Sequence, residues 1–100
     1  LPTGAPRDAA PAALVTGLRA WPNPFNPRTT IGLRLGSDVD ATRLRVYDLR
    51  GRLVDTLHEG PLAAGDHRVA WQAHGLASGV YLYRLEAGGE SHAGKVVLAR

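Results

Sequence analysis

The sequence of 100 residues contains no cysteine. This absence excludes disulfide bonds, thiolate metal sites and thiol nucleophiles, but it does not fix the cellular compartment. No apolar run approaches the length of a membrane span, and no positively charged segment with an apolar core marks a signal peptide. Because the chain starts at Leu1 rather than at methionine, we expect it to be a processed product or a part of a longer protein.

Lysine is also scarce, since Lys95 is the only one, and arginine supplies nearly all of the positive charge behind the net charge of +3. Arg34, Arg43, Arg45 and Arg84 fall on alternate positions of strand-like segments, which predicts that they line the solvated faces of separate strands. No aromatic residues interleave with them, so the pattern disfavours nucleic-acid binding. A solvated face is also the simpler interpretation of four arginines near one predicted hairpin, although they could meet an anionic surface polysaccharide. These are Arg43, Arg45, Arg50 and Arg52.

Glycine and proline, by contrast, are abundant, with 12 and 7 residues. They divide the chain into many short segments, which favours one all-β domain over a helical one. From residue 14 onward, these segments alternate apolar and polar side chains, as half-buried strands do. Seven segments, spaced about ten residues apart, predict a β-sandwich of about seven antiparallel strands over residues 14–100.

The same alternation predicts which side chains fill the core between the two sheets. In TTIGLRL, for example, the apolar residues share one face and the polar residues the other. Tyr81 is a further bulky candidate for a thin sandwich core, with a hydroxyl group that can bond to a neighbouring loop. The predicted core residues are Ile31, Leu33, Leu44, Val46, Val69, Trp71, Val80 and Leu82.

Glycine-containing turns separate the predicted strands. Gly51 is expected at a hairpin position that requires a positive φ. Gly60-Pro61 and Ala64-Gly65 are expected to break the chain, and Gly88-Gly89 to separate the last two strands.

The segment Trp21-Pro22-Asn23-Pro24-Phe25-Asn26-Pro27, here called the corner, contains three prolines and two aromatic residues. Each proline lacks a backbone donor and biases the preceding residue towards extended geometry, so the segment is predicted to be stiff and kinked. Asn23 and Asn26 are expected to fold their amides back onto the local backbone. Trp21 and Phe25 are too apolar to be left wholly in water, so we expect the corner to plug the sandwich.

Residues that could perform chemistry do not form a recognisable motif. Asp38 and Asp40 form a D-x-D pair in a predicted turn, for which turn capping is favoured over weak calcium binding. Ser78 lacks the surroundings of a nucleophile, and there is no phosphate-binding glycine loop. We therefore predict a protein that is not an enzyme and uses no cofactor. No metal-ligand spacing relates the four histidines, which are His58, His67, His74 and His92.

Five segments occur in an order and spacing typical of one bacterial family: PNPFNPRTTIGLRL, LRVYDLRGRLVDTL, AGDHRVAW, LASGVYLYRLEAGG and KVVLAR. Over residues 18–100 the chain resembles immunoglobulin-like domains that include the C-terminal sorting domains of the type IX secretion system and a domain of flagellar hook-capping proteins. The short WQAHGLASG loop is nearer to the sorting form. The resemblance implies an immunoglobulin-like β-sandwich in an exported bacterial protein, located extracellularly or on the cell surface.

The resemblance also implies roles for individual segments. Residues 22–27 would form the entry corner, Gly51 the hairpin turn and residues 79–83 the central strand. Residues 95–100 would form the terminal strand that carries the export signal, and the secretion machinery would be the partner. The residues of the implied sorting motif are Lys95, Val96, Val97 and Leu98.

Two alternatives to this sorting and surface-attachment function stay open. Residues 1–13 are rich in proline and alanine, as linkers are. Such an extended segment can lie along the exposed edge of a neighbouring copy, and head-to-tail docking of this kind would build an extracellular filament. A carbohydrate-binding accessory domain is the second alternative, and it requires an exposed aromatic platform. The residues predicted to dock in a filament are Leu1, Pro2, Pro6, Pro11 and Leu14.

Overall fold

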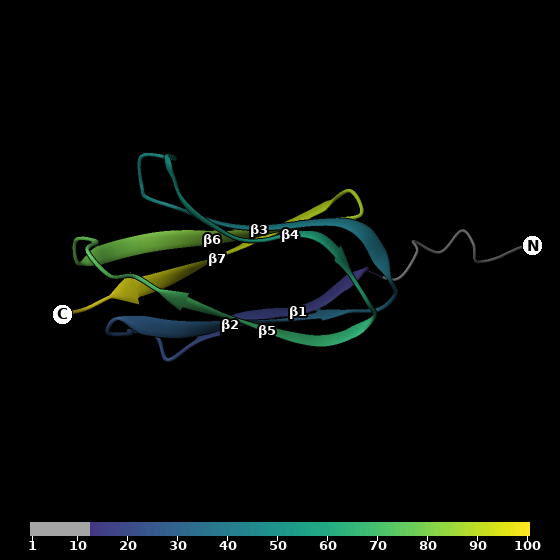
Figure 1. The fold of residues 1–100 in the computed structure, drawn as a ribbon, viewed down its shortest axis with the longest axis horizontal. Helices are drawn as coiled ribbons and strands as arrows, with labels where there is room; N and C mark the ends of the chain where they lie inside the picture. The colour runs from purple at the N-terminus through teal and green to yellow at the C-terminus, as the bar shows by residue number, and fades with distance from the viewer. Residues whose placement is uncertain (1–12) are drawn as a thin grey trace, which may run out of the picture.

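A computed structural model describes residues 13–100, which form two antiparallel sheets packed face to face (Figure 1). The three-stranded sheet has the order β1-β2-β5 and consists of β1 (Val15–Trp21), β2 (Arg28–Leu35) and β5 (Gly65–Gln72). The other sheet has the order β4-β3-β6-β7 and consists of β3 (Val39–Tyr47), β4 (Leu53–Leu62), β6 (Gly79–Ala87) and β7 (Glu90–Leu98). The prediction of an all-β, immunoglobulin-like sandwich of seven antiparallel strands is confirmed. Residues 13–100 include no helix of the length and apolarity that a membrane span requires.

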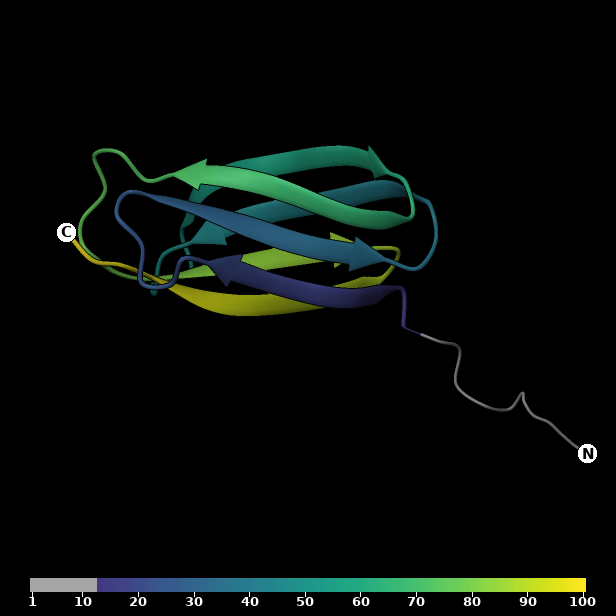
Figure 2. The same cartoon turned by 90° about the horizontal axis from the view of Figure 1, so that it is seen from below.

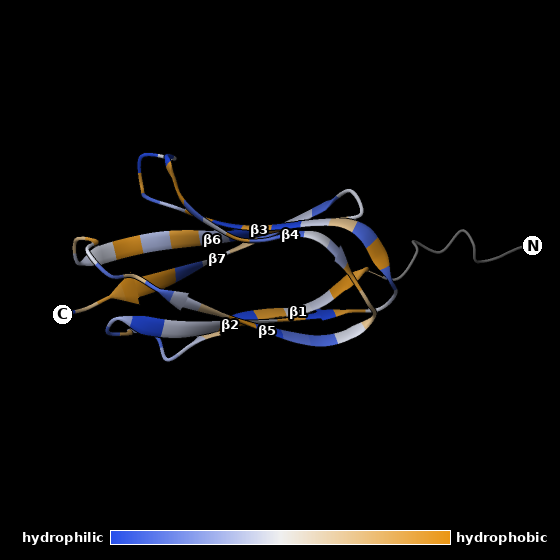
Figure 3. Ribbon diagram, viewed as in Figure 1, coloured by the Kyte–Doolittle hydropathy of each residue, from blue (hydrophilic) through white to orange (hydrophobic). Residues whose placement is uncertain are grey.

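The core lies between the sheets and follows the alternation of the sequence, which Figure 3 shows as hydrophobic and hydrophilic residues in turn along the strands. Trp71 on β5 is its largest member, with 1% of its surface exposed. Its ring lies 5.3 Å from the ring of Phe25 and 5.7 Å from that of Tyr81. The predicted core residues that are buried are Ile31, Leu33, Leu44, Val46 and Trp71, whereas Val69 is half-buried and packs at the margin.

The prediction that Val80 and Leu82 belong to the core is wrong. Both are half-buried on the outer face of β6, while Tyr81, Tyr83 and Leu85 point inward and are buried. Residues 80–83 are apolar at every position, so the sequence does not show which of them face the core. The fully buried Leu85 shows that the odd-numbered residues of β6 point inward. Burial also raises the pKa of the Tyr83 hydroxyl group above its usual value.

β4 continues through Gly60-Pro61 to Leu62, where the sequence predicted a break. β4 is an edge strand of its sheet, so its backbone is paired with a neighbouring strand on one side only. An edge strand tolerates a proline because the missing N–H can lie on the unpaired side. Gly51 lies in the turn between β3 and β4 with φ of 83°, which confirms the predicted positive φ.

The side chain of Glu90, at the start of β7, forms hydrogen bonds with the backbone at the start of β1. Its Oε2 accepts a hydrogen bond from the Leu14 N–H at 2.6 Å, and its Oε1 accepts one from the Val15 N–H at 3.1 Å. The same Oε1 lies 2.9 Å from Nε2 of His92. The bond with His92, followed by the two backbone bonds, lowers the pKa of Glu90 from 4.5 to about 2.

Replacement of Trp71 with alanine should lower the free energy of unfolding by about 3–5 kcal/mol, because a large buried ring is lost and the site cannot fully collapse. The indole N–H has no hydrogen-bond partner among residues 13–100, so the cost arises from packing. Urea denaturation followed by circular dichroism measures it. Leu53→Ala is the control, since Leu53 is 52% exposed and should cost less than about 0.5 kcal/mol. An unfolding midpoint of Trp71→Ala close to that of the wild type would contradict the assigned core.

Acid should destabilise the domain between about pH 4.5 and pH 2 through Glu90. The folded pKa of Glu90 lies below its unfolded value, so its stabilising contribution is complete above pH 4.5 and is lost as the pH falls towards 2. Glu90→Gln cannot titrate, so it should be less stable at neutral pH and lose less stability across this range. Melting temperatures measured against pH test this, and parallel curves for the two proteins would refute it.

Candidate functional site

The terminal strand β7 is held on both sides. One side pairs with β6 from Gly79 opposite Leu98 to Ala87 opposite Glu90. On the other side, near the end of β7, lies the corner. The N–H of Phe25 donates to the Val97 carbonyl at 2.9 Å, and the Phe25 carbonyl accepts from the Ala99 N–H at 3.0 Å. The corner therefore acts as a short parallel strand beside the residues implied to carry the sorting signal.

Asn23 extends this pairing through its side chain. Its Nδ2 donates to the Lys95 carbonyl at 3.1 Å, and its Oδ1 accepts from the Val97 N–H at 2.9 Å. The sequence predicted that Asn23 would bond to its local backbone, and this is wrong, because its partners lie more than 70 residues away. Asn26 forms no side-chain hydrogen bond with any residue in the described range. The amide of Asn23 thus mimics a peptide group and doubles the number of bonds between the corner and β7.

The two aromatic residues of the corner point in opposite directions. Phe25 plugs the core as expected, with 2% exposure and contact with Trp71. Trp21 does not; it is half-buried on the outer face of the three-stranded sheet, because β1 alternates and Ala20 takes the inward position. The Thr29 hydroxyl donates to the Pro22 carbonyl at 2.9 Å and fixes the corner from β2.

The loop between β5 and β6 closes the same end of the sandwich, where Figures 1 and 2 show the C-terminus. The Ala73 N–H donates to the Pro27 carbonyl at 2.8 Å, and Nη2 of Arg100 donates to the Ala73 carbonyl at 3.0 Å. Ser78 accepts from the Arg100 N–H at 3.3 Å, a structural use of its hydroxyl group. The Tyr81 hydroxyl donates to a carbonyl of this loop at 2.6 Å, the loop bond predicted for it.

In the folded domain, only two of the four residues of the implied sorting motif have side chains that another protein can contact. Val96 and Leu98 lie in the core with 0% and 1% exposure. Lys95 and Val97 point outward, opposite Leu82 and Val80 of β6. We call these four outward residues the outer strip: Lys95, Val97, Val80 and Leu82.

The arginines that were considered for an anionic polysaccharide are largely balanced by carboxylates. Arg43 lies 3.3 Å from Glu59 and 3.7 Å from Glu86, and Arg45 lies 3.8 Å from Glu59. The hairpin tip is balanced in the same way, because Asp48 lies 3.0 Å from the Arg52 guanidinium. Backbone bonds from residues 52 and 50, with the Arg52 charge, hold the pKa of Asp48 below its usual value. Arg50, the fourth arginine of the group, forms no ion pair within residues 13–100, so its charge is the one left unpaired there.

Three of the remaining polar candidates have local structural contacts, whereas the buried Nε2 of His58 has no hydrogen-bond partner among residues 13–100. Asp38 accepts a hydrogen bond from the Ala64 N–H at 2.8 Å, which caps the turn before β5. His67 and His74 lie 2.7 Å from the Ala63 carbonyl and 2.8 Å from the Gln72 amide oxygen. Within residues 13–100, no three histidine or acidic side chains gather closely enough to hold a metal ion.

The segment predicted to dock on a neighbouring copy is outside the described residues except at its end. Leu14 packs against the core of its own domain, with its side chain over Gly88. In the described part of the chain, four aromatic side chains are buried, namely Phe25, Trp71, Tyr81 and Tyr83. Trp21 and Tyr47 are half-buried on different sheets, so no two exposed rings form a common platform. The docking residues outside the described range are Leu1, Pro2, Pro6 and Pro11.

Asn23→Ala should lower the free energy of unfolding by about 1–3 kcal/mol, because two hydrogen bonds to β7 are lost. Asn26→Ala is the matched control, with the same chemistry in the same corner but no side-chain bond within residues 13–100, and should be nearly neutral. Hydrogen exchange of the Val97 amide gives a local measurement, since its acceptor is Asn23. Equal exchange rates at Val97 in the two variants would show that the amide does not hold the strand.

The order of the corner, the hairpin and the terminal strand has a counterpart in known proteins. A family model described as "Secretion system C-terminal sorting domain" matches residues 19–99. This range includes the corner and all strands from β2 to β7. No curated protein sequence gives a significant match. The chain belongs to the secretion system C-terminal sorting domain family, and its role is therefore in the secretion and sorting of an exported protein.

Proposed function

We propose that this domain is a folded, non-catalytic signal that the type IX secretion machinery recognises through the outer strip, and that it directs the exported protein to attachment at the cell surface. The observation that carries the proposal is the double pairing of β7, with β6 on one side and the corner on the other. Family membership supports the sorting role itself.

The hydrogen bonds that β7 already forms limit how a partner protein can bind to this strand. Near residues 95–99 the backbone groups on both sides of the strand already have partners, so strand addition by another protein would require the corner to leave. Recognition of the folded domain therefore depends on side chains that point outward. Within residues 95–98 these are Lys95 and Val97, one charged and one apolar.

The outer strip has the composition of a small protein interface. Val97 lies beside Val80, and Lys95 lies beside Leu82, so an apolar patch carries a cation at its border. Tyr47 of β3 pairs with Leu82 and extends the apolar surface. A partner with an apolar patch and an acidic border would complement this face, because a central apolar contact with a charged rim is the usual anatomy of an interface.

Val97→Glu should reduce export of a reporter fused before the domain by about tenfold or more, which corresponds to about 1.4 kcal/mol of lost recognition. The fusion is expressed in a bacterium with type IX secretion, and the reporter is quantified in cells, on washed cell surfaces and in the medium. Thr56→Glu is the control, since it places the same charge on an exposed position of β4 at the opposite edge of the same sheet.

Thermal melts of the purified variants establish that both remain folded before export is compared. Wild-type export of Val97→Glu would refute recognition through the outer strip. Complete release of the wild-type reporter into the medium would instead refute surface attachment and leave sorting intact.

A further inference from the structure

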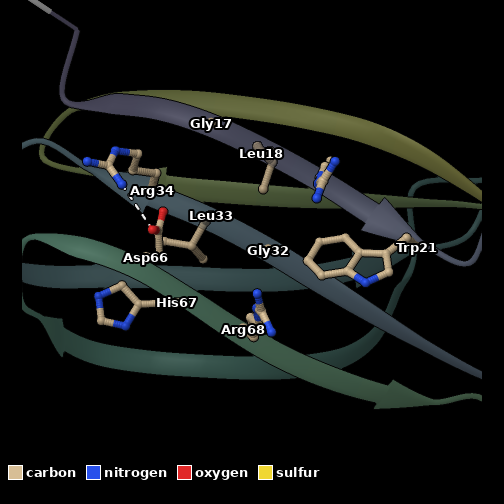
Figure 4. Close-up of a pocket in the computed structure, with 10 residues that line it drawn as sticks. Gly17, Leu18, Trp21, Gly32, Leu33, Arg34, Asp66, His67 and Arg68 are labelled. Atoms are coloured by element: carbon tan, nitrogen blue, oxygen red, sulfur yellow. Dashed lines mark hydrogen bonds and ion pairs between the residues drawn. The ribbon is translucent and has the colours of Figure 1, made fainter.

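The outer face of the three-stranded sheet carries a depression of about 350 Å³ that plays no part in the sorting proposal (Figure 4). It lies on the opposite sheet from the outer strip. Trp21 borders it from β1, Arg68 borders it from β5, and the Arg34–Asp66 ion pair, 2.9 Å apart, closes its other side. The depression is shallow and open to solvent rather than a part of the core.

The position of the Trp21 ring depends on a glycine. A Cβ atom on Gly32 would lie 2.6 Å from Cη2 and Cζ3 of Trp21, so only glycine at this position leaves the ring its place on the sheet. Gly32 pairs with Arg19 of β1 on one side and Arg68 of β5 on the other. The three residues form one row across the sheet, and the indole lies over its middle.

Two guanidinium groups flank this ring. The Cζ atom of Arg19 lies 4.6 Å from the ring centroid, and that of Arg68 lies 5.9 Å from it. Both side chains are exposed, and no carboxylate in the described part of the chain forms an ion pair with either. Asp66, the acidic residue of the depression, is already paired with Arg34. Within residues 13–100, the depression therefore has two cations without a carboxylate partner beside one aromatic surface.

We propose that this depression is a binding site for an acidic saccharide, with a sugar ring against Trp21 and its oxyanion between Arg19 and Arg68. A pyranose ring presents a face of C–H groups that packs on an indole, since both are apolar and the indole face is electron-rich. Guanidinium groups bind planar and tetrahedral oxyanions through paired N–H donors. Neither contact alone selects this ligand, but together they fit a sugar that carries a carboxylate or a sulfate.

A single-stranded nucleic acid is the other polymer that combines rings and anions. Sites for it usually stack successive bases on several aromatic residues, whereas this face has only Trp21 among residues 13–100. The single ring therefore favours a saccharide over a nucleic acid.

Titration of the full chain with two probes tests the proposal: a hexasaccharide of galacturonate and a sulfated hexasaccharide from heparin, each monitored by calorimetry. At least one should bind, and maltohexaose, of the same length but neutral, should not. Arg19→Gln with Arg68→Gln should weaken binding at least about tenfold, because two charge-assisted contacts are lost. Arg43→Gln with Arg84→Gln is the control, since it removes the same charge from the outer face of the other sheet.

Gly32→Ala tests the contribution of the indole ring separately from that of the arginines, because the new methyl group displaces Trp21 and leaves every arginine in the chain. It should weaken binding several-fold, whereas Gly36→Ala, whose Cβ would meet its nearest atom at an ordinary 3.7 Å, should not. Melting temperatures establish that each variant is folded. The proposal is overturned if neither probe binds, if both arginine pairs matter equally, if Gly32→Ala binds as the wild type does, or if a hexathymidylate binds more tightly than the saccharides.

Discussion

The hydrogen bonds between the corner and β7 are the constraint on which the rest of the structure depends. Four of them join Asn23 and Phe25 to residues 95–99, and they connect the beginning of the folded chain to its end. They also set the position of the Phe25 ring, which contacts Trp71 on the other side of the core. One short segment therefore covers the last part of one edge of the four-stranded sheet and fills the end of the core. Loss of either contact would weaken the other, because the same backbone carries both.

The covered part of this edge has a functional consequence. A terminal strand with a free edge could pair with any other exposed strand, which is a common route to aggregation. An exported protein would meet many such strands. With its backbone satisfied near the end, β7 would offer the proposed partner the side chains of Lys95 and Val97 rather than peptide groups. This kind of contact is more selective, since backbone pairing is available to almost any extended chain.

The corner also separates the two outer faces of the sandwich. Phe25 turns inward towards β7 and the core, whereas Trp21, four residues earlier, turns outward over Gly32. The outer strip lies on β6 and β7, and the Trp21 depression lies on β1, β2 and β5 of the other sheet, so one face can contact a protein while the other remains accessible. Sorting and glycan binding would then use separate surfaces of a domain with a single small core.

Local sequence determined much of this architecture. Alternation set the inward faces of β2 and β3, where Ile31 and Leu44 are fully buried, and Gly51 set the hairpin turn. Three prolines were sufficient to predict a corner, because they act through the backbone of their own neighbours. The motif order was also sufficient to predict the family. Each of these features depends on residues that are close together in the chain.

Only the tertiary structure decided the features that depend on distant partners. The stretch Val80 to Tyr83 is apolar on both faces, so pairing and the completely buried Leu85 decided which residues point inward. Asn23 bonds to β7 rather than to its own turn, because strand acceptors and donors lie within reach only after folding. Trp21 lies outside because its strand alternation outweighs its hydrophobicity and because Gly32 makes room for the ring. The sequence by itself thus specified the strands, the turns and the corner, whereas side-chain exposure at the two proposed sites was decided by contacts between segments far apart in the chain.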